Sequence, residues 1–426
     1  MNILILGSGG REHTLAWSII KSPSCTNLYV APGNAGTDSL ATNLSLNVND
    51  FEGIESAIRK YEINLLVVGP EDPLVNGIRD FLEAIDDLKD LMIVGPGKTG
   101  AQLEGSKDFS KKFMFRNGIP TAAYSTFTPE NIEQGYQFLE TLSPPYVLKA
   151  DGLAAGKGVV ILDNLEEAKS TLSEMLVDQK FGDASSRVVI EEFLTGIELS
   201  VFVLTDGQNY LLLPEAKDYK RIGEKDTGPN TGGMGAVSPV PFADEDFMDK
   251  IKERIILPTI QGLKSEDIDY RGFIFFGLIK VGNEPMVIEY NVRMGDPETQ
   301  AVLPRLQSDL VELLTATAKG QIGDLKVVQD PDFATTVVMV SGGYPGSYSK
   351  GIPIHGLKDV QHAEIFHAGT KKDNNEILTN GGRVLAFTGR GETIKKALED
   401  SYAGINQVNW KDAYYRKDIG QDLLSV

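Results

Sequence analysis

The chain has 426 residues, enough for two to four domains that bury a sizeable core. Its 41% apolar and 24% charged residues are ordinary for a globular protein, whereas its formal charge of −19 argues against nucleic acids and anionic membranes as partners. A single cysteine, Cys25, allows no intrachain disulfide and fits a reducing compartment, and the four histidines show no metal-ligand spacing. Because the first apolar run lacks a basic region before it and no apolar stretch is of bilayer length, the sequence predicts a cytoplasmic enzyme or binding protein.

The first hundred residues alternate between short apolar strands and helical patterns. Residues 2–6 predict a buried strand, followed by a glycine-rich turn and a helix over 11–20. Further strands are expected at 28–30, 65–68 and 92–94, with helices at 51–61 and 74–85. This order predicts a small doubly wound α/β unit that ends near residue 103.

The turn at residues 7–10 begins like a dinucleotide-binding fingerprint. The third glycine of that fingerprint would fall at Glu12, so the match is incomplete and NAD is disfavoured. The turn either packs structurally or binds a phosphate at the helix N-terminus. The loops at 31–36 and 69–73 follow strand ends, where ligands collect in such sheets, although loops with no other role would look the same.

A second glycine-rich stretch, residues 146–158, joins two short apolar strands near the middle of the chain. Lys149 lies where the first strand ends, and Lys157 lies inside the loop with Gly152, Gly156 and Gly158. Glycines let backbone N–H groups close on an anion, and either lysine could place its charge against a phosphate. The spacing is not that of a P-loop, because too few residues separate the glycines and no Ser or Thr follows the lysine. A flexible hairpin with two solvated lysines is the alternative.

The segment 121–194 is expected to form a compact α/β unit around this loop. Strands are predicted near 122–126 and 188–190, and helices at 129–142 and 165–177. The last strand runs into Glu191-Glu192-Phe193-Leu194, which can hold an adenine edge through backbone groups and ribose hydroxyls through carboxylates. It can equally be a strand that leaves the core. Glu198 begins the next strand, over 198–204.

The third part of the chain contains a long glycine-rich loop over residues 218–235, which we expect to be structureless and to act as a lid. A helix over 244–263 and a strand over 272–281 precede a mostly apolar strand from residue 285. Alternation would place Glu289, Asn291 and Arg293 on one strand face. Glu and Asn supply oxygen ligands suited to Mg²⁺, and Arg could neutralise a transferring phosphoryl group. A solvated polar face is the alternative.

Beyond about residue 325, the pattern changes again. Strands at 335–340 and 383–388 and a helix at 392–404 predict a further small α+β unit. Glycine-rich turns at 341–346 and 379–383 punctuate it.

Six segments in this order resemble the glycinamide ribonucleotide synthetase family of ATP-grasp ligases, and the resemblance covers nearly the whole chain. The segments are 7–13, 31–36, 103–107, 149–158, 227–235 and 289–299. The resemblance implies an α/β and α+β multidomain protein with an N-terminal doubly wound parallel sheet. The implied domains are an N-terminal domain (1–103), an ATP-grasp domain (104–324) with a lid subdomain at about 121–192, and a small C-terminal α+β domain (325–426).

The resemblance also implies a reaction, in which ATP phosphorylates glycine and the amine of 5-phosphoribosylamine attacks the acyl phosphate. Such an enzyme would use ATP and Mg²⁺ or Mn²⁺, act on small molecules rather than nucleic acids or membranes, and be a monomer or weak dimer. The nucleotide would contact Lys107, Lys149, Gly152, Gly156, Lys157, Gly158, Glu191, Glu192, Phe193, Leu194 and Glu198. The metal would lie on Glu289 and Asn291, and the catalytic residues would be Arg293, Asp218 and Lys220. The substrates would contact Gly9, Gly10, Arg11, Asn34, Glu71 and Arg293.

The chain departs from the family pattern in two places. Lys217 and Tyr219 stand where the family has Gln and His, and residues 273–281 carry no carboxylate for a further metal ligand. Three other classes compete: another ATP-grasp carboxylate–amine ligase, a nicotinamide-dependent oxidoreductase built on the first unit, and a non-catalytic nucleotide sensor. Loss of Lys149, Glu289 or Arg293 would mark the sensor, and all three are present.

Overall fold

The computed structural model describes residues 1–153, 158–180 and 182–424. The chain begins with a parallel sheet in the order β3-β2-β1-β4-β5, as predicted for a doubly wound unit. Residues 3–6 and 65–68 are buried, because helices cover both faces of such a sheet. Its elements are β1 (Asn2–Gly7), α1 (Gly10–Ile19), β2 (Asn27–Pro32), β3 (Thr42–Asn43), α2 (Phe51–Lys60), β4 (Leu65–Val68), α3 (Glu71–Val75), α4 (Ile78–Glu83) and β5 (Met92–Val94).

The single helix predicted over 74–85 is wrong, since α3 and α4 are separate helices. Between them Gly77 adopts a φ of +88°, a left-handed conformation that glycine reaches without steric cost. Because α3 begins earlier than predicted, Glu71 occupies the first turn of a helix at the carboxyl edge of the sheet. An unpredicted helix, α5 (Lys98–Gly105), leads into α6 (Lys107–Arg116). Ser106 caps α6, and its hydroxyl accepts from Phe109 N at 3.1 Å.

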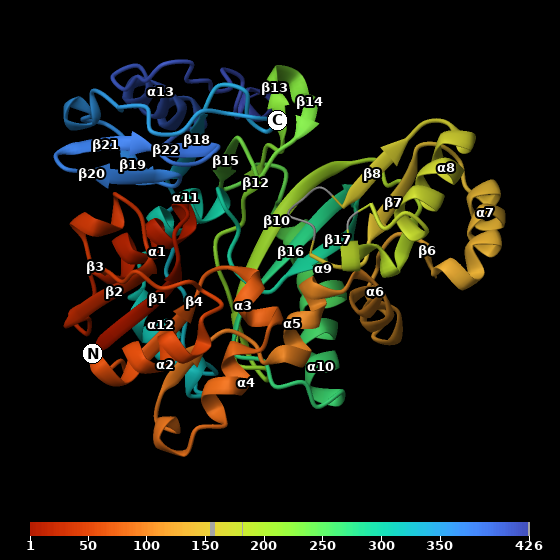
Figure 1. Cartoon of the computed structure of the whole chain (residues 1–426), viewed down its shortest axis with the longest axis horizontal. Coiled ribbons are helices and arrows are strands. Elements are labelled where there is room, and N and C mark those ends of the chain that lie inside the picture. Colours follow the sequence, from red (N-terminus) through yellow and green to blue (C-terminus); the bar gives the residue numbers. More distant parts are fainter. Residues whose placement is uncertain (154–157, 181, 425–426) are drawn as a thin grey trace.

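The segment after α6 forms a lid that projects from the rest of the molecule (Figure 1). Its antiparallel sheet has the order β6-β9-β7-β8, with α7 and α8 packed against it. The lid has an apolar core of its own, which includes Phe127, Leu148, Leu172 and Ile190. The elements are β6 (Tyr124–Phe127), α7 (Ile132–Thr141), β7 (Tyr146–Ala150), β8 (Val159–Leu162), α8 (Leu165–Leu176) and β9 (Val188–Glu191).

A central antiparallel sheet connects the lid to the other parts, in the order β11-β10-β16-β17. β17 ends at Asn291, so the prediction that Arg293 shares this strand with Glu289 is wrong; Arg293 lies in a bend beyond it. The predicted helix over 244–263 is α9 and α10 joined by a π-helical turn. The elements are β10 (Ile197–Thr205), β11 (Tyr210–Leu212), α9 (Glu245–Ile251), α10 (Leu257–Ser265), β16 (Gly272–Val281), β17 (Glu284–Asn291), α11 (Glu298–Val302) and α12 (Leu310–Ala318).

The C-terminal sheet has the order β12-β15-β18-β22-β19 and takes its first two strands from the middle of the chain. The prediction of a structureless loop over 218–235 is therefore wrong, since this segment contains short strands that pair with each other and with β18. No helix within the described ranges is both long and apolar enough to cross a membrane. The elements are β12 (Lys217–Asp218), β13 (Arg221–Gly223), β14 (Thr227–Asn230), β15 (Gly235–Ser238), β18 (Phe333–Val340), β19 (Glu364–His367), β20 (Thr370–Asp373), β21 (Glu376–Thr379), β22 (Arg383–Gly391) and α13 (Ile394–Ile405).

Candidate active site

Three lysines gather around one glutamate where α6 meets the lid sheet. Lys107 and Lys111 are four residues apart on α6 and so share a helix face, while Lys149 comes from β7. Glu191, the last residue of β9, lies 2.9 Å from Lys149 Nζ through Oε1 and 3.0 Å from Lys111 Nζ through Oε2. Lys107 Nζ donates to the Gly152 carbonyl at 3.3 Å. The cluster thus sets three cations around Glu191 in a largely buried place, with Glu289 and Asp151 also near Lys107.

The protonation equilibria of this lysine cluster reflect its surplus of positive charge. Burial alone would raise the pKa of Glu191, but Lys149 and Lys111 outweigh it and the pKa is lowered. Burial lowers the pKa of Lys111 to about 8, and it lowers the pKa of Lys107 as well. A bound anion would favour the charged lysines and offset the cost of burying them. The predicted contacts of Gly156 and Lys157 lie outside the described residues.

The strand end predicted to hold adenine runs directly past the lysine cluster. The Glu191 carboxylate pairs with the lysines, and Glu192 N donates to the Ala123 carbonyl at 2.9 Å inside the lid. Phe193 is 37% exposed and Leu194 is half-buried. These two side chains offer an apolar surface beside the lysines, which suits the flat face of a nucleotide base.

A second charged group lies on β10 and β12. Lys220 Nζ is 2.6 Å from Glu198 Oε2 and 4.0 Å from Asp218 Oδ2. Lys220 lowers the pKa of Glu198, whereas burial raises the pKa of Asp218. The structure therefore brings Asp218 and Lys220 together with Glu198, which was predicted to hold the ribose.

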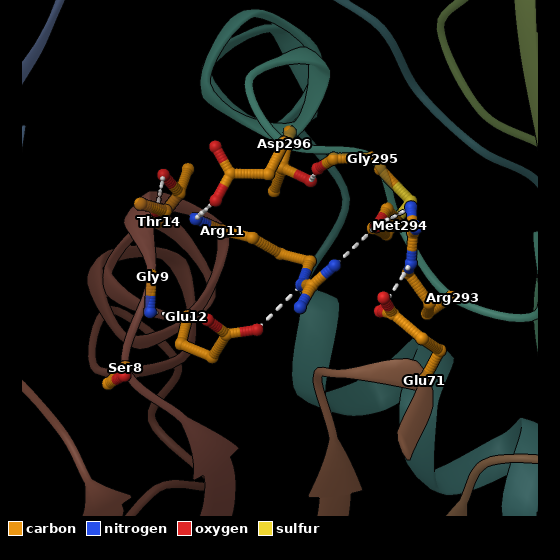
Figure 2. A network of polar contacts seen from close by, with 12 residues as sticks. Ser8, Gly9, Arg11, Glu12, Thr14, Glu71, Arg293, Met294, Gly295 and Asp296 are labelled. Atoms are coloured by element: carbon orange, nitrogen blue, oxygen red, sulfur yellow. Dashed lines mark hydrogen bonds and ion pairs between the residues drawn. The ribbon is translucent and has the colours of Figure 1, made fainter. Parts of the chain in front are cut away.

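Arg293, just after β17, reaches back to carboxylates of the N-terminal part, and Figure 2 shows it turned toward Glu71. Its Nη2 donates to Glu104 Oε1 at 2.8 Å and its Nε donates to Glu71 Oε2 at 3.2 Å. Burial raises the pKa of Glu104 to about 7, and Arg293 offsets only part of this. Burial would also raise the pKa of Glu71, but Arg293 and Arg11 outweigh it and lower the pKa to about 2.

The N-terminus of α1 is already filled by carboxylates of the chain itself (Figure 2). Gly9 N donates to Glu12 Oε2 at 2.6 Å, and Arg11 N donates to Asp296 Oδ2 at 3.2 Å. The Arg11 guanidinium donates to Glu12 Oε1 at 2.6 Å and to the Met294 carbonyl at 3.2 Å. Arg11 therefore ties α1 to the segment after β17.

A cavity of about 310 Å³ opens beside this helix terminus, lined by residues from distant parts of the chain. Asn34 Nδ2 donates to the carbonyls of Ser8 at 2.9 Å and His367 at 2.8 Å, which joins the N-terminal and C-terminal walls. Arg383 lines the C-terminal wall, with Nη1 at 3.4 Å from Asp296 Oδ1. The lining includes Ser8, Gly9, Asn34, Asp296, Thr370 and Arg383.

Two oxygen-bearing side chains, Glu289 and Asn291, lie two residues apart on β17 and so on one strand face. Asn291 is buried, and within the described ranges its Nδ2 has no hydrogen-bond partner. The register places Gly277 opposite Glu289, so β16 adds no carboxylate there. No group of three or more His, Cys, Asp or Glu in the described part of the chain could hold a metal alone. Mg²⁺ often takes one or two protein ligands and completes its shell with phosphates and water, so the pair fits a metal bound with a nucleotide.

Sequence reasoning missed three residues of these clusters: Lys111, Glu104 and Asp296. Lys111 could have been found, because it follows Lys107 by about one helical turn in sequence. Glu104 and Asp296 lie within the segments 103–107 and 289–299, but no strand or helix spacing indicated where they point.

A lid sheet beside a central antiparallel sheet, with Lys149 on the lid, Lys107 and Lys111 on the preceding helix and oxygen-bearing side chains on the last central strand, is the arrangement of an ATP-grasp enzyme, which uses ATP with a divalent metal. Models of phosphoribosylglycinamide synthetase match the chain as the N domain at residues 1–104, the ATP-grasp (A) domain at 105–299 and the C domain at 334–422. The chain belongs to the phosphoribosylglycinamide synthetase family.

Relatives named phosphoribosylamine–glycine ligase match the chain along its whole length. The protein of Vibrio cholerae is 45% identical over 430 residues, covering 100% of this chain and 99% of that protein. The protein of Escherichia coli is 46% identical over 427 residues, covering 99% and 98%. The crystal structure of the Thermotoga maritima phosphoribosylamine–glycine ligase has a TM-score of 0.85 and 36% identity, covering 98% of this chain and 100% of that one. A biotin carboxylase–ATP complex from Campylobacter jejuni, with a TM-score of 0.73, 16% identity and coverage of 96% and 92%, shares the fold.

Proposed function

We propose that this protein joins glycine to 5-phosphoribosylamine with ATP, giving glycinamide ribonucleotide, ADP and phosphate in purine biosynthesis. The observation that carries the proposal is the surplus of buried lysines around Glu191, close to the oxygen ligands on β17. The charges of Glu289 and Lys149 both act on Lys107, which supports a phosphate on the lysines next to a metal on β17. A nucleotide with its metal fills both sites, with its phosphates on the lysines and its metal on the oxygens of β17.

The nucleotide binds between the lid and the central sheet. Lys107 and Lys149 hold its phosphates, with the segment from Gly152 to Gly158, including Gly156 and Lys157, closing over them. Phe193 and Leu194 contact the base together with backbone groups of Glu191 and Glu192, and Glu198 contacts the ribose. Glu289 and Asn291 hold Mg²⁺ or Mn²⁺, which supplies charge neutralisation at the transferring phosphoryl group.

Glycine is activated next to this nucleotide site. A carboxylate is a poor electrophile because an oxide would have to leave, whereas an acyl phosphate releases phosphate. Arg293, with 16% of its side chain exposed and held by Glu104 and Glu71, is a fixed charge that can meet the phosphoryl oxygens. Asp218 and Lys220 face the glycine and its acyl phosphate. Closure of the lid keeps water from the acyl phosphate.

The amine substrate takes the cavity beside α1. Glu12 and Asp296 already occupy the amides of Gly9 and Arg11, so the ribose phosphate lies in the cavity rather than on the helix axis. Gly9, Gly10 and Asn34 form one wall, Arg383 forms the other, and Glu71 lies near the hydroxyls. Arg11, a predicted contact, acts through the turn that it holds in place.

This placement makes Arg383 the cation of the amine site. Arg383→Ala should raise the KM for phosphoribosylamine by roughly tenfold, the loss of one hydrogen bond to a charged group, with the KM for ATP unchanged. Arg390→Ala is the matched control. Arg390 lies on β22, as Arg383 does, but it pairs with Asp330 and does not line the cavity. An unchanged KM for phosphoribosylamine in the Arg383 variant would exclude this placement.

The remaining features follow the family pattern. The domains divide at about residues 103 and 324, with a lid at about 121–192, and the strands β12 and β15 fasten the middle domain to the C-terminal sheet. The enzyme works in the cytoplasm on small molecules, as a monomer or weak dimer, without nucleic acid or membrane partners.

Isotope transfer tests the proposed reaction directly. Glycine with heavy oxygen in its carboxylate is supplied with ATP and freshly made phosphoribosylamine, and the released phosphate is examined by mass. One labelled oxygen per turnover is expected, and ADP release should stop when either substrate is omitted. Unlabelled phosphate throughout would contradict the acyl phosphate. ADP release only with a carboxylate other than glycine, or with an amine other than phosphoribosylamine, would favour a different ATP-grasp ligase.

A further inference from the structure

Asp151, two residues after Lys149, fastens the lid to α6. Its Oδ1 accepts from Asp108 N at 2.7 Å and from Ser106 Oγ at 3.0 Å. Asp108 is the second residue of α6 and Ser106 is the N-cap, so a carboxylate from the lid completes the cap of a helix outside it. Only 12% of the Asp151 side chain is exposed.

The backbone around Asp151 makes the same connection. Lys107 N donates to the Asp151 carbonyl at 3.4 Å, and Lys107 Nζ donates to the next carbonyl, that of Gly152, at 3.3 Å. On the lid side, Asp151 N donates to the carbonyls of Ala184 at 3.0 Å and Arg187 at 3.2 Å. Residue 151 is thus attached to the lid through its amide and to α6 through its carbonyl and carboxylate.

The position of this contact decides what it can do. Lys107 is the first residue of α6, and Lys149 is the last residue but one of β7. Asp151 therefore joins the two chain segments at the points from which the two lysines extend. The lid has a separate apolar core, so polar contacts hold it to α6: those of Asp151, the Thr126–Asp108 hydrogen bond at 2.7 Å and the Lys111–Glu191 ion pair at 3.0 Å.

The charge of Asp151 suits this position. The N-terminus of a helix carries a partial positive charge, which a carboxylate stabilises more than a neutral acceptor does. Arg187 Nη1 lies 4.0 Å from the Asp151 carboxylate and 3.6 Å from that of Asp108, so one lid cation adjoins both acids. The carboxylate is turned to α6, and while burial lowers the pKa of Lys107, the charge of Asp151 acts to raise it.

We propose that Asp151 is a positioning residue, which fixes Lys107 and Lys149 at the spacing that binds one polyphosphate chain. This inference rests on the proposed ATP site. Asp151 acts through the two lysines without touching the nucleotide. A role limited to capping α6 would change the stability of the fold and leave the affinity of the folded enzyme for ATP unaltered.

The test compares two caps. Asp151→Ala removes the contact between lid and helix, and Asn164→Ala removes the side chain that caps α8 inside the lid, where it accepts from Glu166 N at 2.9 Å and Glu167 N at 3.1 Å. Both should lower the melting temperature. Calorimetric titration of the full-length enzyme with Mg-ATP should show about tenfold weaker binding for Asp151→Ala and no change for Asn164→Ala. The KM for ATP should rise in parallel, with the KM for glycine unchanged.

Two further variants add tests that do not rest on the single Asp151→Ala variant. Asp151→Asn retains an acceptor for Asp108 N but loses the charge, and it should weaken ATP binding by about threefold even if the alanine variant fails to fold. In a Lys149→Met background, Asp151→Ala should weaken binding little further, because the lysine that it positions is gone.

Three outcomes separate the possibilities. Unchanged ATP affinity in both Asp151 variants would overturn the inference. Additive losses in the double variant would overturn it as well, since independent effects imply that Asp151 does not act through Lys149. Wild-type enzyme that binds no Mg-ATP would instead overturn the proposed function.

Discussion

The lysine cluster around Glu191 and the acidic cluster around Arg293 are both largely buried, yet their surplus charges have opposite signs. In the first, Lys111 and Lys149 share the carboxylate of Glu191, while Lys107 lies near Glu289 and Asp151 as well. In the second, Arg293 faces two carboxylates, those of Glu71 and Glu104. The contrast indicates where a ligand must supply charge: an anion at the lid, and a cation on the side of β17.

The pKa values of the two clusters show the same contrast. Burial lowers the pKa of Lys111 to about 8 and raises that of Glu104 to about 7, so each is displaced toward its neutral form. A metal nucleotide carries both charges that are missing: its phosphates suit the lysines, and a metal ion on Glu289 and Asn291 would add positive charge near Glu104, whose pKa burial and Glu289 both raise. We therefore expect the two clusters to respond in different ways when their charges are removed.

The largest effect is expected at the lid. Lys149→Met keeps the volume of the stem and removes the charge, and it should lower turnover by about 1000-fold, as for loss of a preorganised charge at a reacting phosphate. Lys169→Met, which removes a lysine paired with Glu140 on the outer face of the lid, should keep its rate. ADP formation by both variants is the measurement. A normally folded Lys149 variant with near-wild-type ADP formation would show that the lid cluster does not bind the nucleotide.

Arg293→Ala should cost roughly 3–4 kcal/mol of activation free energy, mainly as a lower catalytic rate with ATP affinity little altered. It should also destabilise the fold, because Glu104 loses its nearest cation. The double variant with Glu104→Gln separates the two effects. It should recover stability in urea unfolding but not the rate; recovery of the rate would mean that Arg293 only neutralises Glu104.

How far the sequence predicts the site differs between the two clusters. Lys149, Glu289 and Asn291 could be placed from the order of strands, because strand periodicity and strand ends fix where side chains point, whereas Lys107 on α6 was named only through the family resemblance. Arg293 was named, but on the wrong structural grounds, since β17 ends before it. Its partners Glu71 and Glu104 are distant in sequence, and only the packing of α3 and α5 against the central sheet brings them together.

The fold shows the same division. The parallel sheet, the lid and α13 follow from local hydrophobic patterns. The pairing of β15 with β12 and β18 does not, because strands of two to four residues carry too little pattern and β18 lies about a hundred residues after β15. The break between α3 and α4 at Gly77 is likewise not predicted by the sequence pattern, because it depends on the left-handed conformation of this glycine.

A smaller effect is expected in the pH dependence of stability of the metal-free protein. The folded pKa of Glu104 is raised from 4.5 to about 7, so its contribution to stability is complete below pH 4.5 and is lost as the pH rises to 7. The loss amounts to about 3 kcal/mol. Glu71, with its pKa lowered to about 2, acts in the opposite sense, and its contribution is lost only as the pH falls from 4.5 toward 2.

Glu104→Gln removes the first of these two contributions. Urea unfolding at pH 5 and pH 8, with a chelator present, should show that wild type loses more stability between these pH values than the variant does. Glu298, whose pKa burial also raises to about 7, is present in both proteins and so largely cancels from the comparison. An equal loss in the two proteins would show that Glu104 is ionised in the folded state at pH 5.

The smallest effect is expected at the proposed metal pair, Glu289 and Asn291, which would fill only part of the shell of a metal ion. Glu289→Gln removes a charged ligand and Asn291→Ala a neutral one, and the remaining ligands would come from phosphates and water. Each change should therefore raise the Mg²⁺ concentration for half-maximal ADP formation by about 10- to 100-fold, with more loss for Glu289 because it carries the charge. Glu284→Gln, at the other end of β17 and paired with Lys250 and Arg254, is the control and should leave this concentration unchanged. Saturating Mg²⁺ should restore most of the rate in both ligand variants, since the nucleotide still presents its own oxygens. If neither variant changes the metal dependence, the metal is bound elsewhere, and the carboxylates near Arg293 do not mark the metal site.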